Sequence, residues 1–151
     1  MNLLIRSFLI ATLCLASACA GKRELTKSKK YISLLQSTTT RTIPGRVEGE
    51  PVTDYSFTLV WKHQDQPVAF FWKKDGNWQI CGIQEKGSNT VFTDVQKGDT
   101  LMVTPLRRVS EGMPWGIPED LDQALVFRTA KSGWRYIKVQ EFKQMPDIIL
   151  Q

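Results

Sequence analysis

The sequence is poor in the residues that most often carry catalysis and metal binding. Its 151 residues include one histidine and three cysteines. The histidine, His63, lies in the turn-like stretch WKHQDQP near Asp65, and neither a nucleophile in a recognisable turn nor a cluster of metal ligands accompanies it. No glycine-rich loop of the kind that holds phosphate is present either. The sequence therefore predicts a protein that is not an enzyme and that uses no metal or cofactor.

The sequence also lacks an apolar run long enough to cross a membrane. The apolar part of FLIATLCLASACAGKRE is roughly a dozen residues, whereas a membrane-spanning helix needs about twenty. The positive charge of Arg6, the apolar centre and the small residues at 16–20 follow the order of a secretory signal peptide. We therefore expect an exported protein whose residues 1–18 form a signal helix that is removed.

The end of this leader resembles that of a bacterial lipoprotein precursor, in which leucine and two small residues precede a cysteine that receives lipid. Here Ala16, Ser17 and Ala18 precede Cys19, and Leu15 stands one position further out than the family pattern prefers. The resemblance implies fatty acids such as palmitate on Cys19 and stable anchoring to a membrane of a Gram-negative-type cell envelope, with the outer membrane favoured. In the alternative, the leader is cut as an ordinary signal peptide and the product is periplasmic or secreted.

This interpretation also accounts for the cysteines. Cys14 would leave with the leader and Cys19 would carry lipid, so Cys81 alone would remain in the folded part and no intrachain disulfide would form. Because Cys81 lies in the apolar stretch WQICGI, we expect a small buried side chain rather than a reactive thiol.

The stretch after Cys19 is basic and carries a single acidic residue, Glu24. Residues 19–37 are expected to form a solvated tether, and its basic side chains could also contact anionic lipid. These side chains are Lys22, Arg23, Lys27, Lys29 and Lys30. The stretch YISLLQ at the end of the tether fits either a short helix or a docking strand.

Residues 38–151 are predicted to form one all-β domain. Short runs of β-branched and aromatic residues alternate with Gly, Pro, Asp and Asn, and DYSFTLVWK places Tyr55, Phe57, Leu59 and Trp61 on one face. Turns are expected at KDGN, QKGD and KSG, where Gly76, Gly98 and Gly133 permit tight reversals. Pro44 suggests an edge strand or the approach to one, and the terminal PDIILQ suggests a last edge contact.

Seven or eight strands joined mostly by hairpins favour a β-sandwich, immunoglobulin-like or transthyretin-like, over a parallel sheet. A small closed β-barrel is the second choice. The net charge of +5 is too small to indicate nucleic-acid binding. Trp61, Trp72, Trp78 and Trp134 fall in predicted strands and are expected in the core or on a half-buried sheet surface.

The candidate ligand-binding residues lie in the long loop VSEGMPWGIPEDLDQ. Trp115 at its centre could stack on a sugar ring or on an apolar group of a partner, or fold back over the core. Glu119, Asp120 and Asp122 could hold a hard cation, but their spacing lacks the ligand series of a calcium loop, and a surface acidic cluster is favoured.

The chain as a whole resembles the small lipoproteins of Gram-negative cell envelopes, and we expect a membrane-anchored module that binds a protein or glycan of the envelope. A carbohydrate-binding accessory domain and an inhibitor of an envelope hydrolase are the alternatives. A basic inhibitor of this kind would need an acidic target, since like charges slow association.

Overall fold

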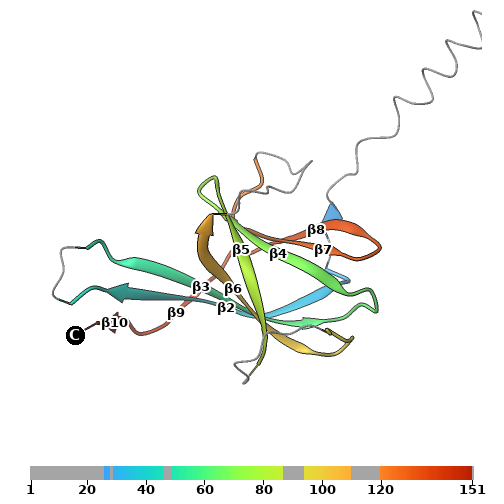
Figure 1. Ribbon diagram of the computed structural model, residues 1–151, viewed down its shortest axis with the longest axis horizontal. Coiled ribbons are helices and arrows are strands. Elements are labelled where there is room, and N and C mark those ends of the chain that lie inside the picture. Colours follow the sequence, from blue (N-terminus) through green and yellow to red (C-terminus); the bar gives the residue numbers. More distant parts are fainter. Residues whose placement is uncertain (1–25, 28, 46–48, 87–93, 110–119, 151) are drawn as a thin grey trace, which may run out of the picture.

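A computed structural model describes residues 26–27, 29–45, 49–86, 94–109 and 120–150 of the chain. The described part is all-β and contains ten strands in one sheet (Figure 1). The strands are β1 (Thr26–Lys27), β2 (Ile32–Ile43), β3 (Val52–Trp61), β4 (Pro67–Lys74), β5 (Asn77–Glu85), β6 (Thr100–Val109), β7 (Ala124–Thr129), β8 (Gly133–Lys138), β9 (Lys143–Gln144) and β10 (Ile148–Ile149).

The sheet is open and bends over itself in a sandwich-like arrangement. Its order is β1-β8-β7-β4-β5-β6-β3-β2-β10, with β9 also on β2. β3 and β7 are separated by three strands in this order, yet the rings of Trp61 and Phe127 lie 5.7 Å apart. The two parts of the sheet therefore face each other across one core. The second choice of a closed barrel is wrong, because β1 and β10 end the path as separate edges within the part of the chain that the structure describes.

The alternation in the sequence explains the main core. Phe57, Leu59 and Trp61 of β3 are fully buried, and Phe70 and Trp72 of β4 meet them from the facing part of the sheet. Each large apolar side chain that is removed from water stabilises the fold by roughly 1.5–3 kcal/mol. Tyr55 is half-buried and packs against the same cluster, so the predicted inward face of β3 is confirmed.

A second apolar cluster lies on the opposite face of β4, because neighbouring residues of a strand point to opposite sides. Phe71 and Trp78 are buried there with Ala124 and Val126 of β7, and Trp134 packs against them. Trp61 and Trp72 occupy the main core, so the four strand tryptophans lie in the core or on a half-buried sheet surface, as predicted.

The expected turns adopt the conformations that their residues allow. Asp75 (φ 51°) and Gly76 (φ 75°) join β4 to β5, and Gly133 (φ 72°) lies at the turn between β7 and β8. Positive φ at both central positions matches the right-handed twist of a two-residue hairpin. Gly98 in QKGD also has positive φ (103°), and it lies in the turn that leads into β6.

The first long strand, β2, begins at Ile32, ahead of residue 38, where the β domain was expected to start. YISLLQ is therefore a strand from Ile32 onward, and Tyr31 and Ile32 belong to the core. β1 lies within residues 19–37, which were expected to form a tether. It pairs in parallel with Arg135 and Tyr136 of β8.

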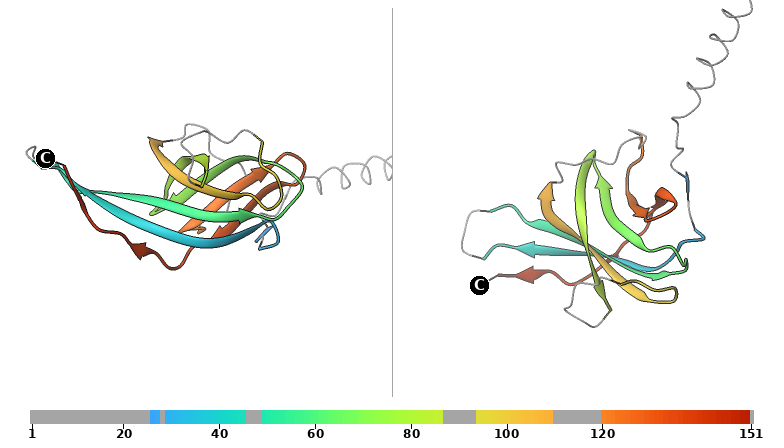
Figure 2. Two further views of the ribbon diagram at one scale, coloured as in Figure 1. Left: turned by 90° about the horizontal axis from the view of Figure 1, so that it is seen from below. Right: turned by 45° about the vertical axis from the view of Figure 1, so that its right-hand side comes forward.

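β2 and β3 form a long pair that extends beyond the rest of the sheet (Figures 1 and 2). β2 ends at Ile43, directly before Pro44, which cannot donate to a ladder. β10 pairs in parallel with Thr42 and Ile43, so the expected edge contact of PDIILQ is confirmed. The signal helix expected in residues 1–18 lies outside the described residues.

Candidate functional site

The sequence-predicted site residues are only partly within the described structure. Cys19, Trp115 and Glu119 lie outside it, as do Lys22 and Arg23. Asp120 and Asp122 are exposed ahead of β7. The hydrogen bond to the Tyr55 hydroxyl raises the pKa of Lys74, burial opposes the increase, and the charges of Asp75 and Asp122 add to it. Asp122 therefore lies near the β4–β5 turn, and no cluster of three or more metal-ligating side chains occurs among the described residues.

His63 and Asp65 support the fold. The His63 ring stacks on Tyr31 with the ring centroids 4.1 Å apart, and its Nδ1 accepts a hydrogen bond from the Asp65 backbone N–H at 3.0 Å. The Trp61 indole N–H donates to the Asp65 backbone carbonyl at 3.1 Å. This histidine therefore shapes the turn between β3 and β4.

The Asp65 carboxylate holds a second turn, the one between β7 and β8. It accepts hydrogen bonds from the backbone N–H groups of Lys131 and Ser132 and from the Ser132 hydroxyl, at 3.0–3.2 Å. Burial alone would raise the pKa of Asp65, but hydrogen bonds from Thr129, Lys131 and Ser132 together outweigh it and lower the pKa below 3.8. The carboxylate stays ionised and joins two hairpins.

Cys81 is buried in the main core, as the sequence predicted for a small apolar side chain. Burial strongly raises the pKa of its thiol, and a hydrogen bond with the Trp72 backbone opposes the shift only in part. Because the thiolate is the reactive form, the Cys81 thiol is inert at neutral pH.

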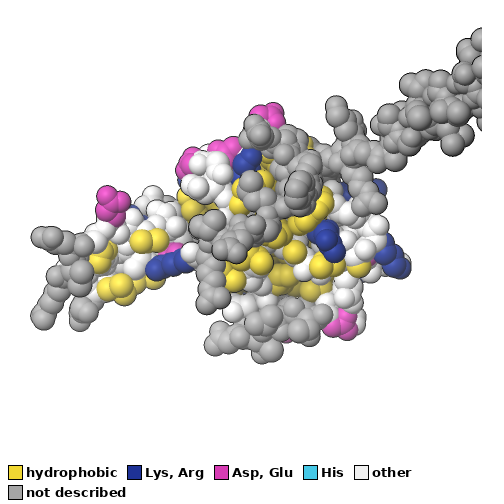
Figure 3. Space-filling model, turned by 45° about the horizontal axis from the view of Figure 1, so that its top comes forward, with side chains coloured by type: hydrophobic (Ala, Val, Ile, Leu, Met, Phe, Trp, Pro, Cys, Tyr) yellow, Lys and Arg dark blue, Asp and Glu magenta, His cyan; other side chains and the backbone are white. Residues whose placement is uncertain are grey.

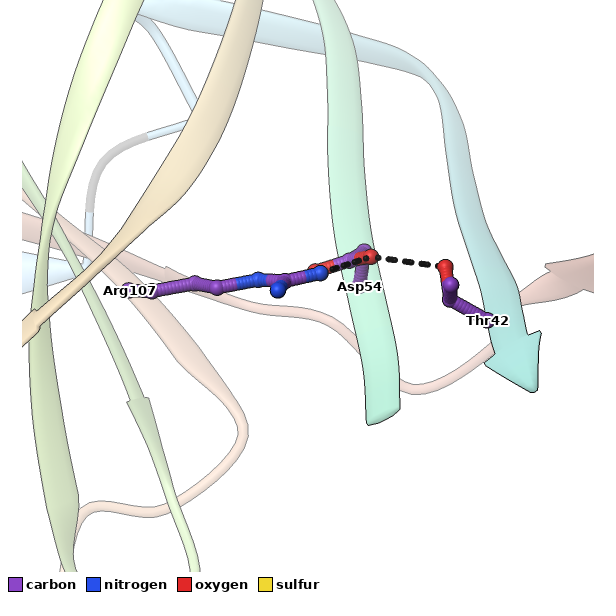
Figure 4. Close-up of polar contacts among 3 residues, drawn as sticks. All are labelled: Thr42, Asp54 and Arg107. Atoms are coloured by element: carbon purple, nitrogen blue, oxygen red, sulfur yellow. Dashed lines mark hydrogen bonds and ion pairs between the residues drawn. The ribbon is translucent and has the colours of Figure 1, made fainter. Parts of the chain in front are cut away.

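The long β2–β3 pair carries a polar contact on its outer part. Arg107 of β6 approaches the Asp54 carboxylate with an N–O distance of 3.2 Å, and the Thr42 hydroxyl donates to the same carboxylate at 3.4 Å (Figure 4). Both charged side chains are well exposed, so the pair contributes at most about 1 kcal/mol. We assign it a role in holding β6 against the extended pair.

Hydrophobic side chains are also exposed on the molecule. Figure 3 shows them in the middle of one face and along the extended arm, among charged side chains. The arm exposes Val52 together with Ile148, Ile149 and Leu150 at the end of the chain. Val52 pairs with Thr42 at the end of the long β2–β3 ladder, and Ile148 and Ile149 form the short parallel pairing with β2.

A groove lies between the first half of β2 and the segment that follows β8. One part has a volume of about 540 Å³, and the adjoining part, which shares Leu34 and Lys138 with it, has about 310 Å³. Its lining residues are Lys29, Ile32, Ser33, Leu34, Leu35, Gln36, Ser37, Lys62, Ile137, Lys138, Val139, Gln140, Glu141, Phe142 and Lys143. We call this concavity the β2 groove.

The β2 groove is positively charged at its rim. Lys29, Lys62, Lys138 and Lys143 are all exposed, and Glu141 is the one acidic residue of the lining. The Ser37 hydroxyl donates to the Glu141 backbone carbonyl and fixes the segment after β8 against β2. A volume of several hundred Å³ is the size at which small ligands and peptide side chains are bound.

Sequence reasoning missed this groove, because its four lysines are far apart along the chain. Lys29 falls in the stretch expected to form a tether, and Lys62, Lys138 and Lys143 each occur without another lysine or arginine beside them in the sequence. Only the return of the chain after β8 to the edge of β2 brings them together, and parallel pairings such as β2–β9 carry no local sequence signal.

No helix in the described ranges is long and apolar enough to pass through a lipid bilayer. Comparison of the chain with protein-family models, with curated proteins and with solved structures finds no significant match.

Proposed function

We propose that this chain is an exported, non-enzymatic binding protein of a bacterial cell envelope, anchored to the outer membrane by lipid on Cys19, and that its β domain binds a partner in the β2 groove. The anchor follows from the leader, with its short apolar run and the small residues before Cys19. The groove is the observation that carries the binding part of the proposal.

The chemistry of the groove supports binding rather than reaction. Four exposed lysines line it together with the apolar residues Ile32, Leu34 and Phe142. The buried ionised carboxylate of the described structure, Asp65, is satisfied by hydrogen bonds within the β7–β8 turn. A charged rim around apolar contacts is the usual arrangement of a surface that binds another molecule.

The pairing of β1 with β8 limits how far the domain can be from the bilayer. Thr26 is fixed to Arg135, so only the residues between Cys19 and Thr26 separate the acylated cysteine from the sheet. An extended chain of this length spans at most about 25 Å. The partner of the β2 groove is therefore expected to be a protein that lies close to the membrane surface.

The anchor is tested by growing a Gram-negative host that expresses the full chain with radiolabelled palmitate. We expect label on the wild-type chain, which fractionates with membranes, and none on the Cys19→Ala variant. A wild-type chain that carries no label and is recovered as a soluble periplasmic protein would contradict the anchor.

The groove is tested in the same cells with a photoreactive amino acid at Leu35, which is 57% exposed and lines the groove, or at Val68 of β4, which is 52% exposed and lies outside it. We expect an adduct from position 35 and not from position 68. Equal adducts from the two positions, or none from either, would contradict binding in the groove.

A further inference from the structure

Among the described residues, no strand pairs with one edge of β2 where it borders the groove. β2 pairs with β3 along almost its whole length. On its other edge, within the described ranges, β9 pairs only at Thr38–Thr39 and β10 only at Thr42–Ile43. No described strand lies against this edge between Ile32 and Ser37, and this is the part of β2 that lines the groove.

The backbone groups of this edge point away from β3. The Lys62 N–H donates to the Tyr31 backbone carbonyl. The Trp61 N–H instead donates to the Asp99 backbone carbonyl, on the side of β3 that faces away from β2. Trp61 is opposite Ile32 and Leu59 is opposite Leu34. Because hydrogen-bonded and non-hydrogen-bonded pairs alternate along antiparallel strands, Ile32 and Leu34 direct their N–H and C=O groups toward the groove side.

A free strand edge beside a groove is a template for another strand. Main-chain hydrogen bonds then supply affinity, and alternate side chains enter the neighbouring surface. Leu35, at the irregularity of the β2–β3 register, and Phe142 offer apolar contacts next to this edge. The lysine rim determines which charges such a strand would carry, since opposite charges steer association and like charges oppose it.

We propose that the β2 groove binds an extended acidic peptide segment of a partner protein, which adds as a strand to β2 between Ile32 and Ser37 and places its carboxylates near Lys29, Lys62, Lys138 and Lys143. This inference rests on the proposed binding function and goes beyond it by naming the chemistry of the partner and the mode of binding.

The first test titrates the mature lipidated chain, which begins at Cys19, in a non-ionic detergent, with three eight-residue peptides by calorimetry. The first peptide alternates Val and Glu, the second has Lys in place of Glu, and the third is the first with alternate backbone amides methylated. We expect binding of the first and at least about tenfold weaker binding of the others, because the second reverses the charge and the third removes the strand's donors. Equal binding of the lysine peptide would overturn the acidic partner, and equal binding of the methylated peptide would overturn strand addition.

Variants of the chain locate the site. Lys138→Glu should weaken the acidic peptide about tenfold, whereas Lys131→Glu, the same charge change at an exposed position in the β7–β8 turn, should change its affinity less than twofold. Leu34→Pro removes an N–H that points to the groove and not to β3, so it should abolish binding while the circular dichroism spectrum stays that of a β protein. If Leu34→Pro fails to fold, the methylated peptide remains as an independent test of the same hydrogen bonds. Equal effects of the two lysine variants would place the acidic peptide elsewhere and overturn the proposal.

The two proposals fail in different ways. If the chain forms adducts through position 35 in cells but binds none of the peptides, the groove binds a partner and the acidic strand is wrong. If the partner captured at position 35 is a second copy of this chain, the groove binds a partner but the proposal of an acidic peptide strand is wrong. If neither adducts nor peptide binding are found, both proposals are wrong.

Discussion

At the scale of single residues, Asp65 connects two turns that are far apart in the sequence. Its backbone contacts His63 and Trp61 beside β3, and its carboxylate accepts three donors in the turn between β7 and β8. Asp65→Asn would place an amide N–H₂ against N–H donors, and we expect a loss of about 2 kcal/mol in the free energy of unfolding. Urea unfolding at pH 7 measures this loss, with Asp147→Asn, at an exposed position, as the control for the charge change.

The free energy of unfolding should depend on pH differently in the wild-type chain and in Asp65→Asn. The pKa of Asp65 in the folded chain is below the ordinary value of 3.8, so the unfolded state binds more protons and stability from this group rises with pH. This contribution is complete above pH 3.8 and is lost as the pH falls through the lower, folded pKa. The difference in urea midpoint between wild type and Asp65→Asn should therefore narrow below pH 3.8. If the difference in urea midpoint stayed constant until the chains unfold in acid, the ionised form of Asp65 would make no contribution to stability.

At the scale of elements, the β4–β5 and β7–β8 hairpins and the terminal edge contact were predictable from the sequence, whereas the short edge strands β1 and β9 were not. Alternation placed Phe57, Leu59 and Trp61 in the core, and Asp75 with Gly76 specified the β4–β5 turn, because these signals act within a few residues. β1 and β9 have two residues each and pair in parallel with distant strands, so no local period marks them. The same reason hid the β2 groove, which forms only where the end of β8 returns to the edge of β2.

The turn between β4 and β5 provides a test of this local specification. Gly76 has a φ of 75°, and a Cβ there would meet nothing within 4 Å, so Gly76→Ala adds backbone strain without a clash. We expect a loss of about 1 kcal/mol in the free energy of unfolding. Gly82→Ala is the matched control, because its Cβ would make only an ordinary contact with Leu106 at 3.6 Å. An equal loss in the two variants, measured by urea unfolding, would contradict a role for positive φ at Gly76.

At the scale of the whole molecule, the open sheet brings the basic N-terminal stretch and the β2 groove to the same region. β1 is joined to β8, Lys29 lies on the rim of the groove, and β2 starts directly after it. The stretch expected to contact anionic lipid is thus partly incorporated into the sheet. Lys29 and Lys30 are exposed there, so contact with a bilayer would orient the domain as well as add affinity.

Binding to vesicles separates this contribution from the lipid anchor. A chain that begins at residue 19 with Cys19→Ala has no acyl chain, and any affinity for phosphatidylglycerol vesicles must then come from charge. Each basic residue near an anionic surface contributes about 1 kcal/mol, so Lys29→Glu with Lys30→Glu should weaken binding by at least about tenfold at low salt. The double variant Arg41→Glu with Lys143→Glu makes the same charge change at exposed positions farther along the sheet, beside Thr53 and Thr38, and should have a smaller effect. Binding by the unsubstituted chain should also weaken steeply as salt is raised, because screening shortens the reach of these charges. Equal weakening by the two double variants would mean that only the net charge of the domain matters and that the stretch around Lys29 makes no specific contact with the membrane.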